Sequence, residues 1–124
     1  MLADWWEDLI MEGTAGHRLI SGLGRRAEDR IVAKRRYDAF FGTDLEQLLR
    51  EQGVEELTVA GVMTNLCVET TVREAFVRDF RVHVLMDATA TATEEMHVAS
   101  LVNMAFGFAH VVTTDEWLHR LARP

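Results

Sequence analysis

Residues 57–71 read LTVAGVMTNLCVETT and join a short apolar run to the start of an amphipathic segment. The run Leu57–Val62 is rich in β-branched residues and does not alternate between apolar and polar positions, which is typical of a strand buried on both faces of a parallel sheet. Thr64 or Asn65 is suited to cap a helix, because either side chain accepts hydrogen bonds from free backbone amides. The stretch therefore predicts a strand, a turn and a helix, with Cys67 in the first turn of the helix.

Three other short apolar runs extend this pattern on both sides of the central stretch. Helical segments separate the runs, and this alternation predicts right-handed βαβ units. We therefore expect an α/β fold, a doubly wound sandwich around a mainly parallel sheet. Before residue 31 we expect a loop followed by a short helix. The additional strands are predicted at Ile31–Ala33, Val82–Met86 and Val111–Thr113.

Four helices are expected from their end signals and their apolar spacing. Thr43–Glu46 and Thr91–Glu94 both have the Thr-x-x-Glu pattern of a capping box, and Gly53 and Gly107 are placed to end the helices that follow. The other two helices are predicted at about residues 65–79 and 115–121. The residues expected to face the core are Leu45, Leu48, Leu49, Val68, Val72, Ala75, Phe76, Val98, Leu101, Val102 and Ala105.

Composition and charge narrow the class of protein. The chain has 124 residues, of which 48% are hydrophobic and 27% are charged, and this balance favours one globular domain over residues 1–124. A net charge of −7 gives no electrostatic support for binding nucleic acid or an anionic membrane, so a small molecule is the expected partner. No apolar stretch approaches the ~20 residues that span a bilayer. The single cysteine cannot form an internal disulfide, which favours the cytoplasm.

Two reactive side chains follow predicted strands. In an open α/β sheet, ligands bind at the carboxyl ends of the strands, and Lys34 and Cys67 are both expected there. The free amides at a helix N-terminus stabilise a thiolate and can hold an oxyanion, and a nearby ammonium favours the thiolate or delivers a proton to a leaving group. The alternatives stay open, because a lone cysteine is usually a small buried hydrophobe and a lysine beside Arg35 and Arg36 is usually solvated.

Three segments together resemble the isochorismatase-like cysteine hydrolases in order and spacing. They are KRRYDAFFGTDL at residues 34–45, AGVMTNLCV at residues 60–68, and Asp87-Ala88. The resemblance extends from about Trp5 to Trp117. It implies a three-layer αβα sandwich of the Rossmann-like kind and a hydrolase that needs no cofactor. The Gly-Val-x-Thr-Asn-x-Cys segment is more similar to the amidase branch than to the true isochorismatases.

The resemblance also implies roles for particular residues. The family uses an Asp-Lys-Cys triad, in which Cys67 would be the nucleophile that forms a thioester and Lys34 the triad lysine. A non-proline cis peptide is implied between Val62 and Met63, and the amides of Met63 and Cys67 would form the oxyanion hole. Tyr37 and Phe40 flank the lysine and are candidates for the substrate pocket, although packing in the core is an equal alternative for them.

One part of the family pattern has no match in this sequence. The triad aspartate belongs to an apolar N-terminal strand, whereas Asp4 and Asp8 lie in an acidic segment that contains tryptophans. We therefore expect a domain that is incomplete at its N-terminal side, with unpaired strand edges that favour a homo-oligomer. The strand that carries metal ligands in some members has no match either, and the histidines show no paired metal spacing, so no metal is expected.

The function expected on these grounds is hydrolysis of a C–N bond in a small amide or carbamoyl compound through a cysteine thioester. Two alternatives stay open. One is a catalytically incomplete α/β module that assembles with itself or with a partner. The other is vinyl-ether hydrolysis of the isochorismatase type.

Overall fold

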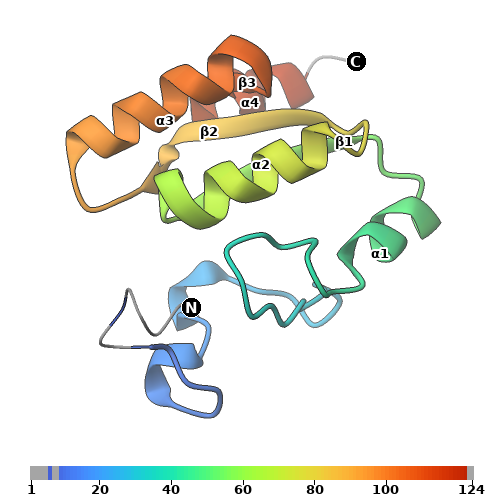
Figure 1. Cartoon of the computed structure of the whole chain (residues 1–124). Helices are drawn as coiled ribbons and strands as arrows, with labels where there is room; N and C mark the ends of the chain where they lie inside the picture. Colours follow the sequence, from blue (N-terminus) through green and yellow to red (C-terminus); the bar gives the residue numbers. More distant parts are fainter. Residues whose placement is uncertain (1–5, 7–8, 123–124) are drawn as a thin grey trace. The chain divides into compact units, whose positions relative to one another are not determined.

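The computed structural model describes residues 6 and 9–122 of the chain. It divides into two compact units, Met1–Ile31 and Val32–Pro124, which are coloured along the sequence in Figure 1. In the first unit the described residues form two short 3-10 helices, Ala15–His17 and Ser21–Leu23, without buried residues. The single domain over residues 1–124 stays a prediction.

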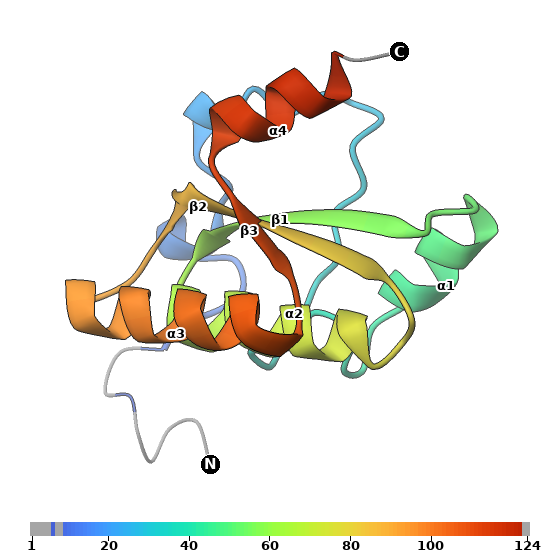
Figure 2. The same cartoon turned by 90° about the horizontal axis from the view of Figure 1, so that it is seen from above.

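The second unit contains three parallel strands in the order β1-β2-β3. They are β1 (Glu56–Val62), β2 (Arg81–Ala90) and β3 (His110–Val112). Figure 2 shows the sheet between α4 (Thr114–Leu121) on one side and both α2 (Glu69–Phe76) and α3 (Glu94–Gly107) on the other. This arrangement confirms the predicted α/β fold with a parallel sheet flanked by helices.

The strand predicted at Ile31–Ala33 is wrong, because these residues have no strand conformation. In the part of the chain that the structure describes, the sheet consists of β1, β2 and β3, and none of them pairs with this segment. Ile31 is 62% exposed. An apolar triplet without a hydrogen-bonded neighbour gains neither the ladder nor the burial that would hold it as a strand.

The core lies between the sheet and the α2–α3 layer. It confirms the inward positions predicted for Val68, Val72, Ala75 and Leu101. The buried apolar residues are Phe40, Val68, Val72, Ala75, Phe80, Val82, Val84, Leu101 and Met104. Leu45 and Leu49 of α1 (Leu45–Glu51) are partly buried against them.

Several residues predicted to face the core lie outside it. Phe76 is 47% exposed, Val98 49% and Val102 63%, and Ala105 is also exposed. The buried residues of α3 are Ser100, Leu101 and Met104 instead. The error has a simple cause, because α3 has apolar residues around most of its circumference and its sequence alone does not specify which side is buried.

The expected helix ends are only partly correct. Neither predicted capping box forms: the N-cap of α1 is Asp44 without a side-chain cap, and that of α3 is Thr93, whose hydroxyl accepts from the Met96 amide. Gly53 has the expected left-handed backbone, with φ of 68°. Gly107, however, is the last residue of α3 rather than the residue after it.

Candidate active site

Cys67 lies in a turn at the carboxyl end of β1. This turn, Thr64–Val68, is a π-helical segment that leads directly into α2. The carbonyl of Met63 accepts hydrogen bonds from the amides of Leu66 at 3.1 Å and Val68 at 3.2 Å. The predicted helix of about residues 65–79 is therefore a wide turn followed by a shorter α-helix that ends at Phe76.

The backbone enters the Cys67 turn through a cis peptide bond between Val62 and Met63. This is the bond that the family resemblance implies. The side chains of Thr64 and Val68 are buried and fasten the turn to the interior, while Cys67 is half-buried as a free thiol. The turn is thus anchored at both ends, with the sulfur between the anchors.

Lys34 reaches this turn from a distant part of the sequence. Its ammonium donates a hydrogen bond to the Arg36 carbonyl at 2.8 Å and lies 3.5 Å from the Cys67 sulfur. A cation at this distance attracts a thiolate more strongly than a neutral thiol. The structure therefore brings together the two reactive residues that the sequence singled out, although Lys34 lies in a segment without regular secondary structure and not at the end of a strand.

The segment after Lys34 is fixed to α2 by a compact turn. The buried carboxylate of Asp38 accepts from the amides of Phe40 at 2.9 Å and Phe41 at 2.8 Å. The hydroxyl of Thr71, on α2, accepts from the Ala39 amide at 3.1 Å. The elements that carry the lysine and the cysteine are therefore connected directly, and their separation depends on a short, well-bonded stretch of chain.

The two aromatic residues proposed for a substrate pocket have different environments. Phe40 is 6% exposed, and its ring stacks on Phe80 with centroids 6.0 Å apart, which is the core packing considered as the alternative. Tyr37 is half-buried. A role in a substrate pocket stays a prediction for both residues.

Three residues at or just before the start of α3, His97, Thr91 and Met96, hold the Cys67 turn through contacts that the sequence analysis did not predict. The Thr64 hydroxyl lies 2.9 Å from Nδ1 of His97. The Asn65 side chain accepts from the Thr91 hydroxyl at 2.6 Å and donates to the Met96 sulfur at 3.7 Å. These partners are far apart in the sequence and follow no periodic pattern, so no signal in the sequence pairs them.

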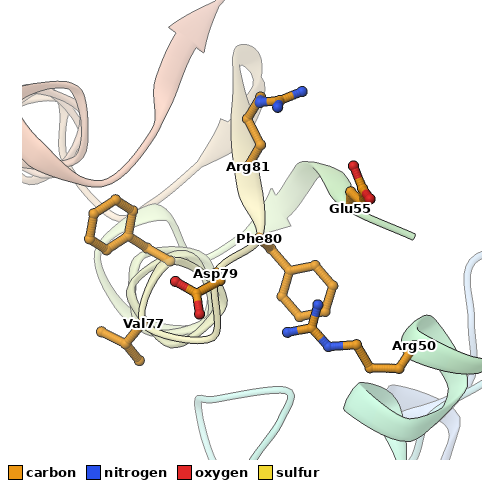
Figure 3. Close-up of a pocket in the computed structure, with 7 residues that line it drawn as sticks. Arg50, Glu55, Val77, Asp79, Phe80 and Arg81 are labelled. Atoms are coloured by element: carbon orange, nitrogen blue, oxygen red, sulfur yellow. The ribbon is translucent and has the colours of Figure 1, made fainter. Parts of the chain in front are cut away.

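One pocket lies away from Cys67, at the amino ends of β1 and β2. It has a volume of about 560 Å³ and is lined by residues 50, 55, 76, 77 and 79–81. Figure 3 shows Arg50 extending toward the Phe80 ring, and its guanidinium carbon lies 4.0 Å from the ring centroid. Neither Lys34 nor Cys67 lines this pocket, so it is not part of the candidate site.

The described residues contain no group of three or more histidine, cysteine, aspartate or glutamate side chains arranged to hold a metal ion. The absence of a metal and of a cofactor stays a prediction. None of the helices in the described part of the chain combines the length and hydrophobicity needed to cross a bilayer.

Known proteins match this chain over most of its length. The Isochorismatase domain family matches residues 2–116. Nicotinamidase 3 of Arabidopsis thaliana is 47% identical over 119 residues, which are 94% of this chain and 60% of that protein. Ureidoacrylate amidohydrolase RutB of Serratia proteamaculans is 36% identical over 117 residues, which cover 94% of this chain and 47% of RutB.

A solved structure of an isochorismatase-like hydrolase has the same fold as this chain. The isochorismatase-like hydrolase from Alkaliphilus metalliredigens superposes with a TM-score of 0.87 at 36% identity, over 90% of this chain and 62% of that one. The chain thus spans about half to three fifths of the length of these relatives. Because the family match, the sequence identities and the fold agree, the chain belongs to the Isochorismatase domain family of hydrolases.

Proposed function

We propose that this chain provides the nucleophile of a cysteine hydrolase that cleaves a C–N bond in a small amide or carbamoyl compound. The observation that supports this most directly is the 3.5 Å separation between the Lys34 ammonium and the Cys67 sulfur at the carboxyl end of β1. The names of the relatives agree with the bond type, because a nicotinamidase and a ureidoacrylate amidohydrolase are both among them. They favour amide hydrolysis over the cleavage of a vinyl ether.

In the proposed reaction, the Cys67 thiolate attacks the carbonyl carbon of the substrate. A C–S bond forms, and the electron pair of the carbonyl moves to its oxygen. When this intermediate collapses, the C–N bond breaks, the amine leaves with a proton, and a thioester remains on Cys67. Water then attacks the thioester, which releases the acid and restores the thiol.

Residues of this chain can stabilise the thiolate and the oxyanion that form in this reaction. Lys34 holds the thiolate in place by charge and is suited to deliver a proton to the leaving amine. We assign the oxyanion hole to the amides of Met63 and Cys67, because Met63 directly precedes the turn that bears Cys67 and the buried Thr64 and Val68 anchor that turn.

The reaction also requires a base that accepts the proton of the Cys67 thiol. In the described part of the chain, the hydrogen bonds of Lys34 go to the Arg36 carbonyl and to Cys67, and no carboxylate is among these partners. The proposal therefore requires an aspartate that joins this pair in the complete active site. We also propose that the protein is cytoplasmic, in agreement with the single cysteine of the chain, and that it forms a homo-oligomer.

This missing contact favours a second candidate, a non-catalytic α/β module that acts in assembly. The two functions are separated by measuring ammonia release from nicotinamide and from ureido compounds, with the intact mass of the protein recorded during turnover. We expect ammonia release and a mass increase equal to the acyl group, and both are lost in Cys67→Ala. If neither signal is observed while sedimentation shows a stable oligomer, the module is the better description.

A further inference from the structure

The turn that carries Cys67 is held by the first turn of α3, and this contact has no part in the reaction described above. Thr64 is fully buried, with 0% of its surface exposed. A buried hydroxyl without a hydrogen-bond partner destabilises the fold, so the conformation of the turn depends on the hydrogen-bond partner of Thr64. Its partner is Nδ1 of His97, at 2.9 Å.

We propose that His97 is a positioning residue for the nucleophile, acting through its hydrogen bond to Thr64. The inference rests on the proposed role of Cys67 as a nucleophile. Thr64 follows Met63, the residue assigned to the oxyanion hole, and lies three positions before Cys67 in the same turn. Movement of Thr64 therefore changes the positions of both the oxyanion amides and the sulfur.

The surroundings of His97 make it a fixed point of attachment. The N-terminus of α3 is capped by Thr93, whose hydroxyl accepts from the Met96 amide at 3.3 Å. Met96 and Thr91 each contact the Asn65 side chain, the neighbour of Thr64. A well-capped helix start thus contacts two successive residues of the turn, and of these only Thr64 is fully buried.

The bond to Thr64 distinguishes this role from simple packing. A histidine that only fills space is replaced well by an aromatic ring without nitrogen atoms. A histidine that holds Thr64 is replaced well by a smaller side chain that keeps a polar atom at the place of Nδ1. His97→Phe and His97→Asn therefore give opposite results under the two explanations, and asparagine is the conservative variant for the hydrogen bond.

The test measures the rate constant for alkylation of Cys67 by iodoacetamide at neutral pH, which needs no substrate. Cys67 is the only cysteine, so the signal is specific. We expect His97→Phe to slow alkylation about three- to tenfold, the range that corresponds to loss of one net hydrogen bond. His97→Asn should remain within about twofold of the unchanged chain. His17→Phe, at an exposed position in the other unit, is the matched control.

Two results would overturn the proposal. One is an unchanged alkylation rate in His97→Phe, and the other is a rate in His97→Asn that is as slow as the rate in His97→Phe. Thr64→Val adds a second check, because His97→Phe should have little further effect in that background. Failure of the proposed function is recognised separately, since ammonia release that persists in Cys67→Ala contradicts the nucleophile whatever the alkylation rates of the His97 variants are.

Discussion

The imidazole of His83, on β2, is fully buried, and its Nε2 pairs with the carboxylate of Glu56 on the neighbouring strand β1. Arg120 of α4 approaches both, at 3.4 Å from His83 Nε2 and 3.0 Å from the Glu56 oxygen. The His83 ring also lies against the rings of His110 and Trp117, with centroids 5.1 and 4.3 Å away. Charged and titratable groups from β1, β3 and α4 therefore meet at one buried imidazole.

This cluster predicts a loss of stability in mild acid. Burial is the main cause that lowers the pKa of His83 below its ordinary value of 6.5, and the positive charge of Arg120 acts in the same direction. Burial raises the pKa of Glu56, but the hydrogen bond with His83 and the charge of Arg120 outweigh it and hold that pKa below 4.5. The unfolded chain then binds more protons than the folded chain as the pH falls.

Both groups stabilise the folded chain less as the pH falls, but over different pH ranges. The contribution of His83 is complete above about pH 6.5 and is lost as the pH falls from there through the lowered pKa of the folded state. That of Glu56 is lost only below about pH 4.5. We expect the midpoint temperature of thermal unfolding to decrease as the pH is lowered from 8 to 5. His83→Gln should make this decrease smaller. A midpoint that rises over this interval would contradict the assignment.

Removing the charge of Lys34 should slow the chemistry of Cys67. We expect Lys34→Met to reduce the rate of iodoacetamide alkylation at pH 7 by about fivefold, since unit charges 4 Å apart interact by about 1 kcal/mol in water. Lys34 is the only lysine of the chain. Lys34→Arg keeps the charge and should retain most of the rate, and Arg30→Met serves as the control. Equal rates in all three variants would show that the ammonium does not act on the sulfur.

Two apolar residues of α3 should differ sharply in their effect on folding. Met104 is fully buried in the core, so Met104→Ala is expected to lower the free energy of unfolding by about 2–5 kcal/mol. Phe106 is 94% exposed on the same helix, and Phe106→Ala should change it by less than about 0.5 kcal/mol. Urea unfolding measures both values. A large loss in Phe106→Ala would mean that its ring is covered in solution.

The N-terminus of α4 carries the one complete capping box among the described helices, made by Thr113 and Glu116. We expect Thr113→Ala to lower the free energy of unfolding by about 1 kcal/mol, because the Glu116 amide loses its acceptor. Glu94→Ala is the control, since Glu94 belongs to the Thr-x-x-Glu pattern that does not form a box. Comparable losses in the two variants would show that the geometry of the box has no special effect.

The reactive pair could be predicted from the sequence, but the contacts that place it could not. Cys67 follows an apolar run that is recognisable locally, and the motif around it is specific. Lys34 was expected at the end of a strand, but it lies in a segment without regular secondary structure and still contacts the Cys67 sulfur. The pairing of Thr64 with His97 joins residues 33 positions apart and depends on how α3 packs against the turn. Periodicity and local motifs contain no information about such contacts.

The N-cap of α3 also could not be predicted from the sequence alone. Thr91 and Thr93 lie two residues apart, and both precede glutamates, so the sequence offers two overlapping caps. The structure uses Thr93 as the cap, and the Thr91 hydroxyl donates to Asn65 instead. Tertiary contact decided between two locally reasonable hydrogen bonds. At α4 two threonines are adjacent: Thr113 forms the box with Glu116, and the Thr114 hydroxyl donates to Asp87 at 2.9 Å.

The π-helical form of residues 64–68 makes the number of residues in this turn as important as their identity. Each residue of a helix rotates the next side chain by ~100° about the axis. A deletion between Met63 and Cys67 that converted the turn to ordinary α-helix would therefore swing the sulfur away from Lys34 while leaving every reactive residue in the chain. Within this family, an alignment gap at this point would mark loss of the site even where lysine and cysteine are both retained.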